Sequence, residues 1–453
     1  MSPSHAPRLI APIHSTSLIY PPKCLPIFIL LPHHTLVYSC QPDMSQTINN
    51  HHTRAEIKGL TLFDTLYNDL ILRHTLPYLP VSGILNLAAT CQDIRYLLHE
   101  TPGVFRHLDL TRVKTAHCEE VKQERKLAVW HNVELEDYLT EDDFYAGPLR
   151  GIFSTLSNRS ILQNVQSLIL DGLSVTAELC HDIINDPSYN VRMLSIRGAK
   201  NLNQAKLRAA LAYACRPTRP SNPRLKALYI FSETTDQDAY WSNKGRVIES
   251  TGDMDDWAPC LLACQGIISF DAVLCQGPRH VNSPAFGKPP VRTAANPAVA
   301  TFAVGGCASC GKAPEGIMTS ETHSSALPLL SPPPILSSSV QAATTPRPGH
   351  SSFVPRCAGC LNDRFCVTCN KWWCEACYQP FNNSTGDCGL SKRQVSRSCW
   401  ECGMNCNECI ERTQKTCKKC CGGYCLVHNE GSSGDFCDWC FSSGRGLRRV
   451  SQS

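Results

Sequence analysis

The stretch Cys357–Cys377, CAGCLNDRFCVTCNKWWCEAC, determines how the C-terminal part of this chain folds. It contains three Cys-x2-Cys pairs in succession, and seventeen of the chain's 28 cysteines lie in the range Cys357–Cys440. A Cys-x2-Cys turn directs two thiolates at one metal ion, and a tetrahedral zinc ion needs two such turns. The cysteine pattern therefore predicts zinc binding, because a disulfide scaffold is typical of much shorter secreted chains.

The spacing of the cysteines indicates a duplicated zinc-binding module in residues 357–442. Cys366–Cys377 and Cys417–His428 have the same spacing, with four residues between two ligand pairs. The first copy gains a fourth pair when Cys307–Cys310 is added from upstream. The predicted metal ligands are Cys307, Cys310, Cys357, Cys360, Cys366, Cys369, Cys374, Cys377, Cys399, Cys402, Cys406, Cys409, Cys417, Cys420, Cys425, His428, Cys437 and Cys440.

Two arrangements of these pairs are open. In sequential ribbons, neighbouring pairs share an ion; in a cross-brace, pairs one and three bind one ion and pairs two and four another. We favour the cross-brace, because a four-residue gap is short for neighbouring pairs to close on one ion. This predicts that Cys307 and Cys310 join Cys366 and Cys369, and that Cys357 and Cys360 join Cys374 and Cys377. We expect about four structural Zn²⁺ ions, since closed cysteine-dominated sites leave no position open for catalysis.

A pair of adjacent tryptophans and two further cysteines lie among the predicted ligands. We expect at least one of Trp372 and Trp373 to pack on the zinc core; the alternative is an exposed aromatic anchor for a partner. Cys388 and Cys421 belong to no pair, and we expect both to be free thiols.

Upstream of the array the composition changes. The range Gly277–Pro355 holds 13 of the chain's 31 prolines and several serine runs. Such a segment buries too little apolar surface to fold alone, so residues 276–356 are predicted to be a mostly disordered linker that contains Cys307 and Cys310.

Residues 111–275 are predicted to form a leucine-rich-repeat-like α/β region. The pattern apolar-x-x-Leu-x-apolar occurs at Phe105–Leu110, Val165–Leu170, Val191–Ile196 and Leu225–Ile230. Helix-like stretches at 176–184 and 205–214 separate the last three copies, and a strand followed by a helix at this period is typical of such repeats. The alternative is an unrelated α/β domain whose strands share the pattern.

Residues 56–110 are predicted to be a small helical domain, and within it residues 66–110 resemble an F-box. The resemblance rests on Leu79-Pro80, Leu85, Leu87, Cys91, Arg95, Leu97, Leu98 and Phe105. Two positions depart from the family pattern: Thr65-Leu66-Tyr67 replaces the opening Leu-Pro, and Phe105 stands where tryptophan is common. The cysteine-rich C-terminal region looks like that of a group of fungal F-box proteins.

The F-box resemblance implies a substrate receptor of a cullin ubiquitin ligase, with no catalytic residues of its own. Its helices would dock on a Skp-type adaptor, and the repeats or the zinc module would hold a protein substrate. The expected adaptor contacts are Leu76, Leu79, Pro80, Ile84 and Leu85.

Two other functions fit the cysteine array. One is a RING-like ubiquitin ligase in which a cross-braced zinc module recruits a conjugating enzyme. The other is nucleic-acid binding by zinc ribbons, for which Lys415, Lys418 and Lys419 supply some basic charge. The formal net charge is only +4 and no long block of like charges occurs, so composition gives no nucleic-acid footprint.

The chain ends are predicted to lack folded structure, with a disordered leader at 1–55 and a basic tail at 443–453. The apolar run at 25–31 (LPIFILL) is too short to cross a membrane, and its proline and histidine neighbours make a poor signal peptide. Met44 is an alternative start that would omit this run. We therefore expect a multidomain α+β protein of the cytoplasm or nucleus, where reduced thiols favour metal binding.

Overall fold

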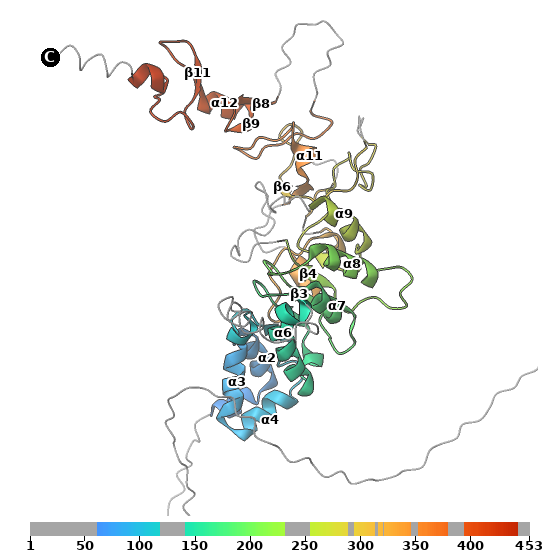
Figure 1. Ribbon diagram of the computed structural model, residues 1–453. Helices are drawn as coiled ribbons and strands as arrows, with labels where there is room; N and C mark the ends of the chain where they lie inside the picture. Colours follow the sequence, from blue (N-terminus) through green and yellow to red (C-terminus); the bar gives the residue numbers. More distant parts are fainter. Residues whose placement is uncertain are drawn as a thin grey trace, which may run out of the picture. The chain divides into compact units, whose positions relative to one another are not determined.

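The computed structural model describes residues 61–117, 141–231, 254–288, 294–312, 316–319, 321–345, 352–378 and 394–442 (Figure 1). The leader predicted at 1–55, the tail predicted at 443–453 and Cys388 lie outside the described residues. No helix in the described part of the chain is long and apolar enough to cross a bilayer.

Short helices form the first described region. They are α1 (Leu62–Leu66), α2 (Asp69–Thr75), the 3-10 helix η1 (Leu76–Tyr78), α3 (Val81–Thr90) and α4 (Gln92–Glu100). Thr61 caps α1 in a reciprocal capping box with Asp64, and the Asn68 side chain caps α2. Pro80 precedes α3, where its missing N–H costs nothing. Leu72 and Leu98 are almost fully buried and hold these helices on the main core.

A parallel sheet follows, and its strands are neighbours in chain order. The strands are β1 (His107–Asp109), β2 (Ser167–Ile169), β3 (Met193–Ser195), β4 (Ala227–Tyr229) and β5 (Ser269–Phe270). Leu108, Leu168, Leu194, Leu228 and Phe270 align across the sheet. The four predicted copies of the leucine pattern supply β1 to β4. The fifth strand was not predicted, because Phe270 stands where the other four copies have leucine.

Helices connect the strands, as parallel pairing requires. They are α6 (Glu141–Asn158), α7 (Ala177–Asn185), α8 (Gln204–Ala214) and α9 (Met254–Ala263), with the 3-10 helices η2 (Lys114–Ala116) and η3 (Leu162–Asn164). Thr176 and Asn203 cap α7 and α8, so the two helix-like stretches predicted from the sequence are confirmed. Leu179 and Leu207 are fully buried and pack in the same core as the aligned leucines.

Two aspartates satisfy polar groups at the strand ends. The Asp171 carboxylate accepts hydrogen bonds from the Ser195 hydroxyl at 2.6 Å and from the Arg197 backbone N–H at 2.9 Å. It also forms an ion pair with the Arg197 guanidinium at 2.6 Å. Asp271 accepts the backbone N–H groups of Ile230 and Phe231, each at 3.0 Å. These bonds compensate for burying the polar groups and connect the loops that follow neighbouring strands.

The prediction that residues 276–356 are mostly disordered is wrong for the part that the structure describes. This part contains β6 (Phe302–Val304), η4 (Ser324–Ala326), α10 (Val340–Thr344) and β7 (Val354–Arg356). Strands β6 and β7 pair antiparallel, and Leu329, Leu330 and Ala343 are buried. The composition argument asked whether the segment folds alone, whereas these residues pack on surfaces that the rest of the chain supplies.

The cysteine-rich region contains little regular structure. Its elements are α11 (Ala358–Leu361), β8 (Val395–Cys399), β9 (Gly403–Cys406), α12 (Asn407–Thr413), β10 (Gln414–Thr416) and β11 (Gly423–Cys425). Strands β8–β9 and β10–β11 form two antiparallel pairs. The buried cluster nearest the described C-terminal end contains only Cys417, Tyr424 and Cys440. Apolar burial alone is a weak source of stability there.

Replacing Leu194 by alanine tests the parallel sheet. Leu194 is fully buried at the centre of the aligned row, so Leu194→Ala is expected to lower the free energy of unfolding by about 2–5 kcal/mol. Lys200→Ala, at an exposed position in the loop that follows the same strand, is the control and should change it by less than about 0.5 kcal/mol. Urea unfolding followed by far-UV circular dichroism measures both. Equal midpoints for the two variants would contradict the described core.

Candidate metal centres

Five groups of four cysteine or histidine side chains meet in the described region. Within each group all four ligand atoms lie within 4.8 Å of one another. Site 1 is Cys275, His280, Cys357 and Cys360; site 2 is Cys307, Cys310, Cys374 and Cys377; site 3 is Cys366, Cys369, Cys406 and Cys409; site 4 is Cys399, Cys402, Cys425 and His428; site 5 is Cys417, Cys420, Cys437 and Cys440.

The structure places all eighteen predicted ligands in these five sites and adds two that the sequence analysis missed. The additions are Cys275 and His280, which complete site 1. Their spacing, Cys-x4-His, differs from the x2 spacing of every other pair. A signal was present nevertheless. The predicted ligands form nine pairs, and an odd number of pairs cannot be grouped two to an ion, so a tenth pair was required.

The predicted partners within the first copy are wrong. Cys307–Cys310 meets Cys374–Cys377, and Cys357–Cys360 meets the new pair Cys275 and His280. The pair Cys366–Cys369 meets Cys406–Cys409, which belongs to the second copy. Along the sequence, the first ligand pair of each site therefore lies between the two ligand pairs of the preceding site. Site 3 joins the two copies, because it takes one pair from each. The interleaving that defines a cross-brace is present, but it runs through the whole array.

A tight hairpin explains why the neighbouring pairs Cys366–Cys369 and Cys374–Cys377 serve different sites. Phe365 and Trp372 form an antiparallel bridge, and the Trp373 N–H donates to the Arg364 carbonyl at 3.0 Å. The first pair lies in the turn of this hairpin, whereas the second follows its returning strand. Sequence spacing records the short separation along the chain but not this difference in direction.

The distances between sulfur atoms fit a tetrahedral metal site. With metal–sulfur bonds of about 2.3 Å, tetrahedral geometry separates two sulfur atoms by about 3.8 Å. The distances are 3.7 Å for Cys275–Cys360, 3.9 Å for Cys310–Cys374, 3.6 Å for Cys369–Cys406, 3.5 Å for Cys402–Cys425 and 3.8 Å for Cys420–Cys437. A disulfide would need about 2.05 Å, and all cysteines in the described residues are free thiols.

The histidine of site 1 is oriented for coordination. The Nδ1 atom of His280 lies 2.5 Å from the Asn296 carbonyl oxygen. Because a carbonyl only accepts, Nδ1 carries the proton and the lone pair is on Nε2. The Nε2 atom lies 3.3 Å from the sulfur atoms of both Cys357 and Cys360. The hydrogen bond from Nδ1 to the Asn296 carbonyl fixes this tautomer, as is usual for metal-binding histidines.

Site 1 is also closely packed. Its four ligands are all buried, and the Cys275 sulfur accepts the backbone N–H groups of Gly277 at 3.4 Å and Cys357 at 3.2 Å. A Cβ atom on Gly277 would lie 2.7 Å from the Cys360 sulfur, so only glycine fits at this position.

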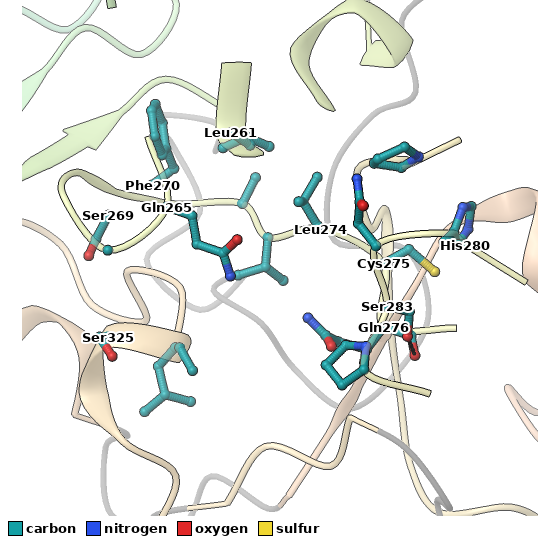
Figure 2. Close-up of a pocket in the computed structure, with 18 of the residues that line it drawn as sticks. Leu261, Gln265, Ser269, Phe270, Leu274, Cys275, Gln276, His280, Ser283 and Ser325 are labelled. Atoms are coloured by element: carbon teal, nitrogen blue, oxygen red, sulfur yellow. Dashed lines mark hydrogen bonds between the residues drawn. The ribbon is translucent and has the colours of Figure 1, made fainter. Parts of the chain in front are cut away.

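A small pocket of about 160 Å³ lies beside site 1. Figure 2 shows Cys275 and His280 on one side of this pocket and Leu261 and Phe270 on the other. Ligand-binding cavities are usually about 300–1,000 Å³, so we assign no ligand to it.

Backbone N–H groups favour one thiolate in each of four sites. Burial opposes ionisation of Cys307 and Cys366, yet N–H groups directed at their sulfur atoms lower the pKa of both to about 7. The N–H of Cys420 is the main cause that lowers the pKa of Cys417 to about 6. The pKa of Cys425 also falls to about 6, because N–H groups of its turn outweigh desolvation. Thiolates are the metal-binding form of cysteine, so these turns prepare the sites for a cation.

The adjacent tryptophans Trp372 and Trp373 are both buried. Trp372 and Trp373 pack in one cluster with Cys307, Cys366 and Cys374, so the expectation that at least one packs on the ligand core is confirmed. The alternative, an exposed anchor formed by these two side chains, is wrong. The unassigned Cys421 is exposed and belongs to none of the five groups.

The five expected adaptor contacts differ in exposure. Leu76 and Ile84 are buried in the core, which leaves them no surface for a partner. Leu79 is half-buried, whereas Pro80 and Leu85 are exposed. The sequence pattern located the helices but did not separate their core-facing residues from their outward-facing ones.

No family model, curated protein or solved structure matches this chain. The chemistry of the five sites therefore follows from their geometry. Four protein ligands close each site and leave no open coordination position, which is the arrangement of a structural metal centre.

Metal counting tests site 1 directly. The full chain is expected to hold five metal ions, and Cys275→Ser or Gly277→Ala to reduce the number to four. The first removes a ligand, and the second forces a methyl group against the Cys360 sulfur. Cys421→Ser is the control and should keep five. Inductively coupled plasma mass spectrometry on desalted protein gives the ratio. An unchanged ratio in both site 1 variants would exclude this site.

Proposed function

We propose that this chain is an F-box-type substrate receptor of a cullin ubiquitin ligase, whose helices α1 to α4 dock on a Skp-type adaptor. One observation carries the proposal: large apolar side chains are exposed throughout these helices. They are Leu62, Tyr67, Leu70, Ile71, Tyr78, Leu85 and Tyr96. So many exposed apolar side chains in one short region are typical of an interaction surface.

Three of these side chains mark where the adaptor contacts are expected. Tyr67 and Leu70 are each 69% exposed, and Leu85 is 45% exposed on α3. Leu85 belongs to both the predicted contact set and the observed exposed surface, so substituting it tests adaptor docking most directly. Leu79 and Pro80, which precede α3, belong to the same proposed contact.

The parallel sheet and the metal array complete the proposed receptor. Strand β1 begins seven residues after α4, so a leucine-rich-repeat-like domain follows the docking helices directly. Five adjacent parallel strands in chain order support this assignment. The repeat and metal regions are proposed to hold the protein substrate.

Zinc is the proposed metal. Eighteen of the twenty ligands are cysteines and two are histidines, and closed tetrahedral sets of this kind favour Zn²⁺. A bound zinc ion would join distant turns of a region that has little apolar core, and binding energy of this kind becomes folding energy. The residues of each site hold the ion, and none activates a water molecule.

A RING-like ligase is the second candidate. Val367, Trp400 and Val427 lie within the ligand turns of sites 3 and 4 and are 54%, 82% and 62% exposed. Such side chains suit docking of a conjugating enzyme. Nucleic-acid binding is less favoured. Eighteen thiolates and five divalent ions contribute a charge of −8, which would turn the formal +4 into −4.

Charged substitutions on α2 and α3 test adaptor docking. Leu70→Asp and Leu85→Asp are each expected to weaken binding to a recombinant Skp-type adaptor at least tenfold, because each places a carboxylate in an apolar contact. Asn86→Asp adds the same charge at an exposed position beside Leu85 and should bind like the unmodified chain. Isothermal titration calorimetry measures the affinities. Absence of adaptor binding by the unmodified chain would refute the proposal.

An autoubiquitination assay tests the RING-like candidate. The full chain is incubated with activating enzyme, ubiquitin and a panel of conjugating enzymes. If the array recruits one of them, chains form and Trp400→Ala reduces their rate of formation at least tenfold, because Trp400 is the most exposed of the three apolar side chains in the ligand turns. Chain formation that is equal with and without this protein eliminates the RING-like candidate and leaves adaptor docking untouched.

A further inference from the structure

The two faces of the parallel sheet are covered by different parts of the chain. Leu168, Leu194 and Leu228 pack on the helix side, in the main core. Their neighbours along the strands point to the opposite face, since strand side chains alternate. That face bears Met193, Ala227 and Tyr229, which form a separate cluster. The cluster is completed by residues from the segment 324–345, which we call the strap.

The strap packs closely on this face. Leu329 and Ala343 of the strap are fully buried against Met193, Ala227 and Tyr229, and Val340 packs at the edge of the cluster. The N–H groups of Leu330 and Ser331 both donate to the Ala343 carbonyl, so the two ends of the strap meet over the sheet.

Hydrogen bonds link the strap to strands β5, β4 and β2 and to the residue that precedes β1. The Leu329 N–H donates to the Phe270 carbonyl of β5 at 2.8 Å, and the Tyr229 hydroxyl of β4 donates to the Ser331 carbonyl at 2.9 Å. The hydroxyl oxygens of Ser338 and Ser167 of β2 lie 3.0 Å apart. Arg106, which precedes β1, donates to the Leu336 carbonyl. The contacts therefore run from β5 to β1, across the strand direction.

The segments on both sides of the strap are held together by contacts that do not involve the strap itself. Strands β6 and β7 enclose it as an antiparallel pair, and sites 1 and 2 contain residues on both sides of it. At the β1 end the contact is incomplete, because Arg106 Nε and His107 Nδ1 are buried without hydrogen-bond partners among the described residues. Incomplete satisfaction of buried polar atoms weakens a contact and makes exchange for another ligand less costly.

The sequence of the strap shows what kind of ligand the face accepts. Residues 327–334 read LPLLSPPP, with Pro328 and Pro333 buried. A proline has no N–H, so such a segment is recognised through apolar side chains and backbone carbonyls in an extended conformation. The Tyr229 hydroxyl provides that recognition, since it donates to a carbonyl immediately before the three consecutive prolines. Aromatic residues with polar tips bind proline-rich segments in the same way.

We propose that this sheet face binds an extended, proline-rich apolar segment of a partner protein, and that the strap occupies the face until such a segment displaces it. This names the surface through which the proposed receptor would hold its substrate. The binding step involves no residue of α1 to α4, so it stands whether or not the helices dock an adaptor. The apparent affinity for the partner equals the intrinsic affinity of the free face multiplied by the fraction of molecules in which the face is free.

A peptide of residues 327–345, added to the full chain, is the probe. Leu329→Asp and Ala343→Asp each place a carboxylate in the buried contact and release the strap. We expect both variants to bind the labelled peptide at least tenfold more tightly than the unmodified chain in fluorescence anisotropy. Ile335→Asp changes an exposed strap residue and is the matched control, with the affinity of the unmodified chain. Adding Met193→Asp to either releasing variant should abolish peptide binding.

Equal affinities in the releasing variants, the control and the unmodified chain would overturn the proposal. So would peptide binding that survives Met193→Asp. If the releasing variants do not fold, hydrogen–deuterium exchange on the unmodified chain decides. Excess peptide should then raise deuterium uptake in residues 327–345 and leave α1 to α4 unchanged, whereas unchanged uptake in the strap would refute displacement. Adaptor titration of the same protein reports separately on the proposed function.

Discussion

The fold of the C-terminal part of this protein depends on one constraint: at each site, two short turns must bring their four ligand atoms together. Each of the five sites takes two short turns from separate places in the chain, and each interleaves with the next. The apolar cluster near site 5 contains three buried residues, two of which are ligands. Local packing therefore contributes little there, and the cross-links at the sites determine the path of the backbone.

Site 1 extends this constraint to the region of the parallel sheet. Cys275 and His280 follow β5, the last strand of the sheet, whereas Cys357 and Cys360 follow β7. The chain between these two pairs includes the strap, which returns to cover the sheet. A single buried site thus connects the sheet, the base of the strap and the start of the cysteine array. This explains why a proline-rich stretch that cannot fold alone is ordered here.

The sequence predicted features that depend on local period and spacing. The leucine pattern located β1 to β4, and the Cys-x2-Cys spacing located eighteen of the twenty residues in the five groups. The pairing of the turns was not predictable in this way, since it depends on the direction in which the hairpin at Phe365 and Trp372 sends each turn. Cys275 and His280 were missed because their spacing is unusual. The strap was missed because its stability comes from the face of a distant sheet.

The most direct test of the central claim is ¹¹³Cd NMR of the full chain after the bound metal has been exchanged for cadmium. The five interleaved sites predict five resonances, three in the range of four-sulfur sites and two in the range of sites with three sulfurs and one nitrogen. Four or fewer resonances, or resonances typical of oxygen ligands, would contradict the account.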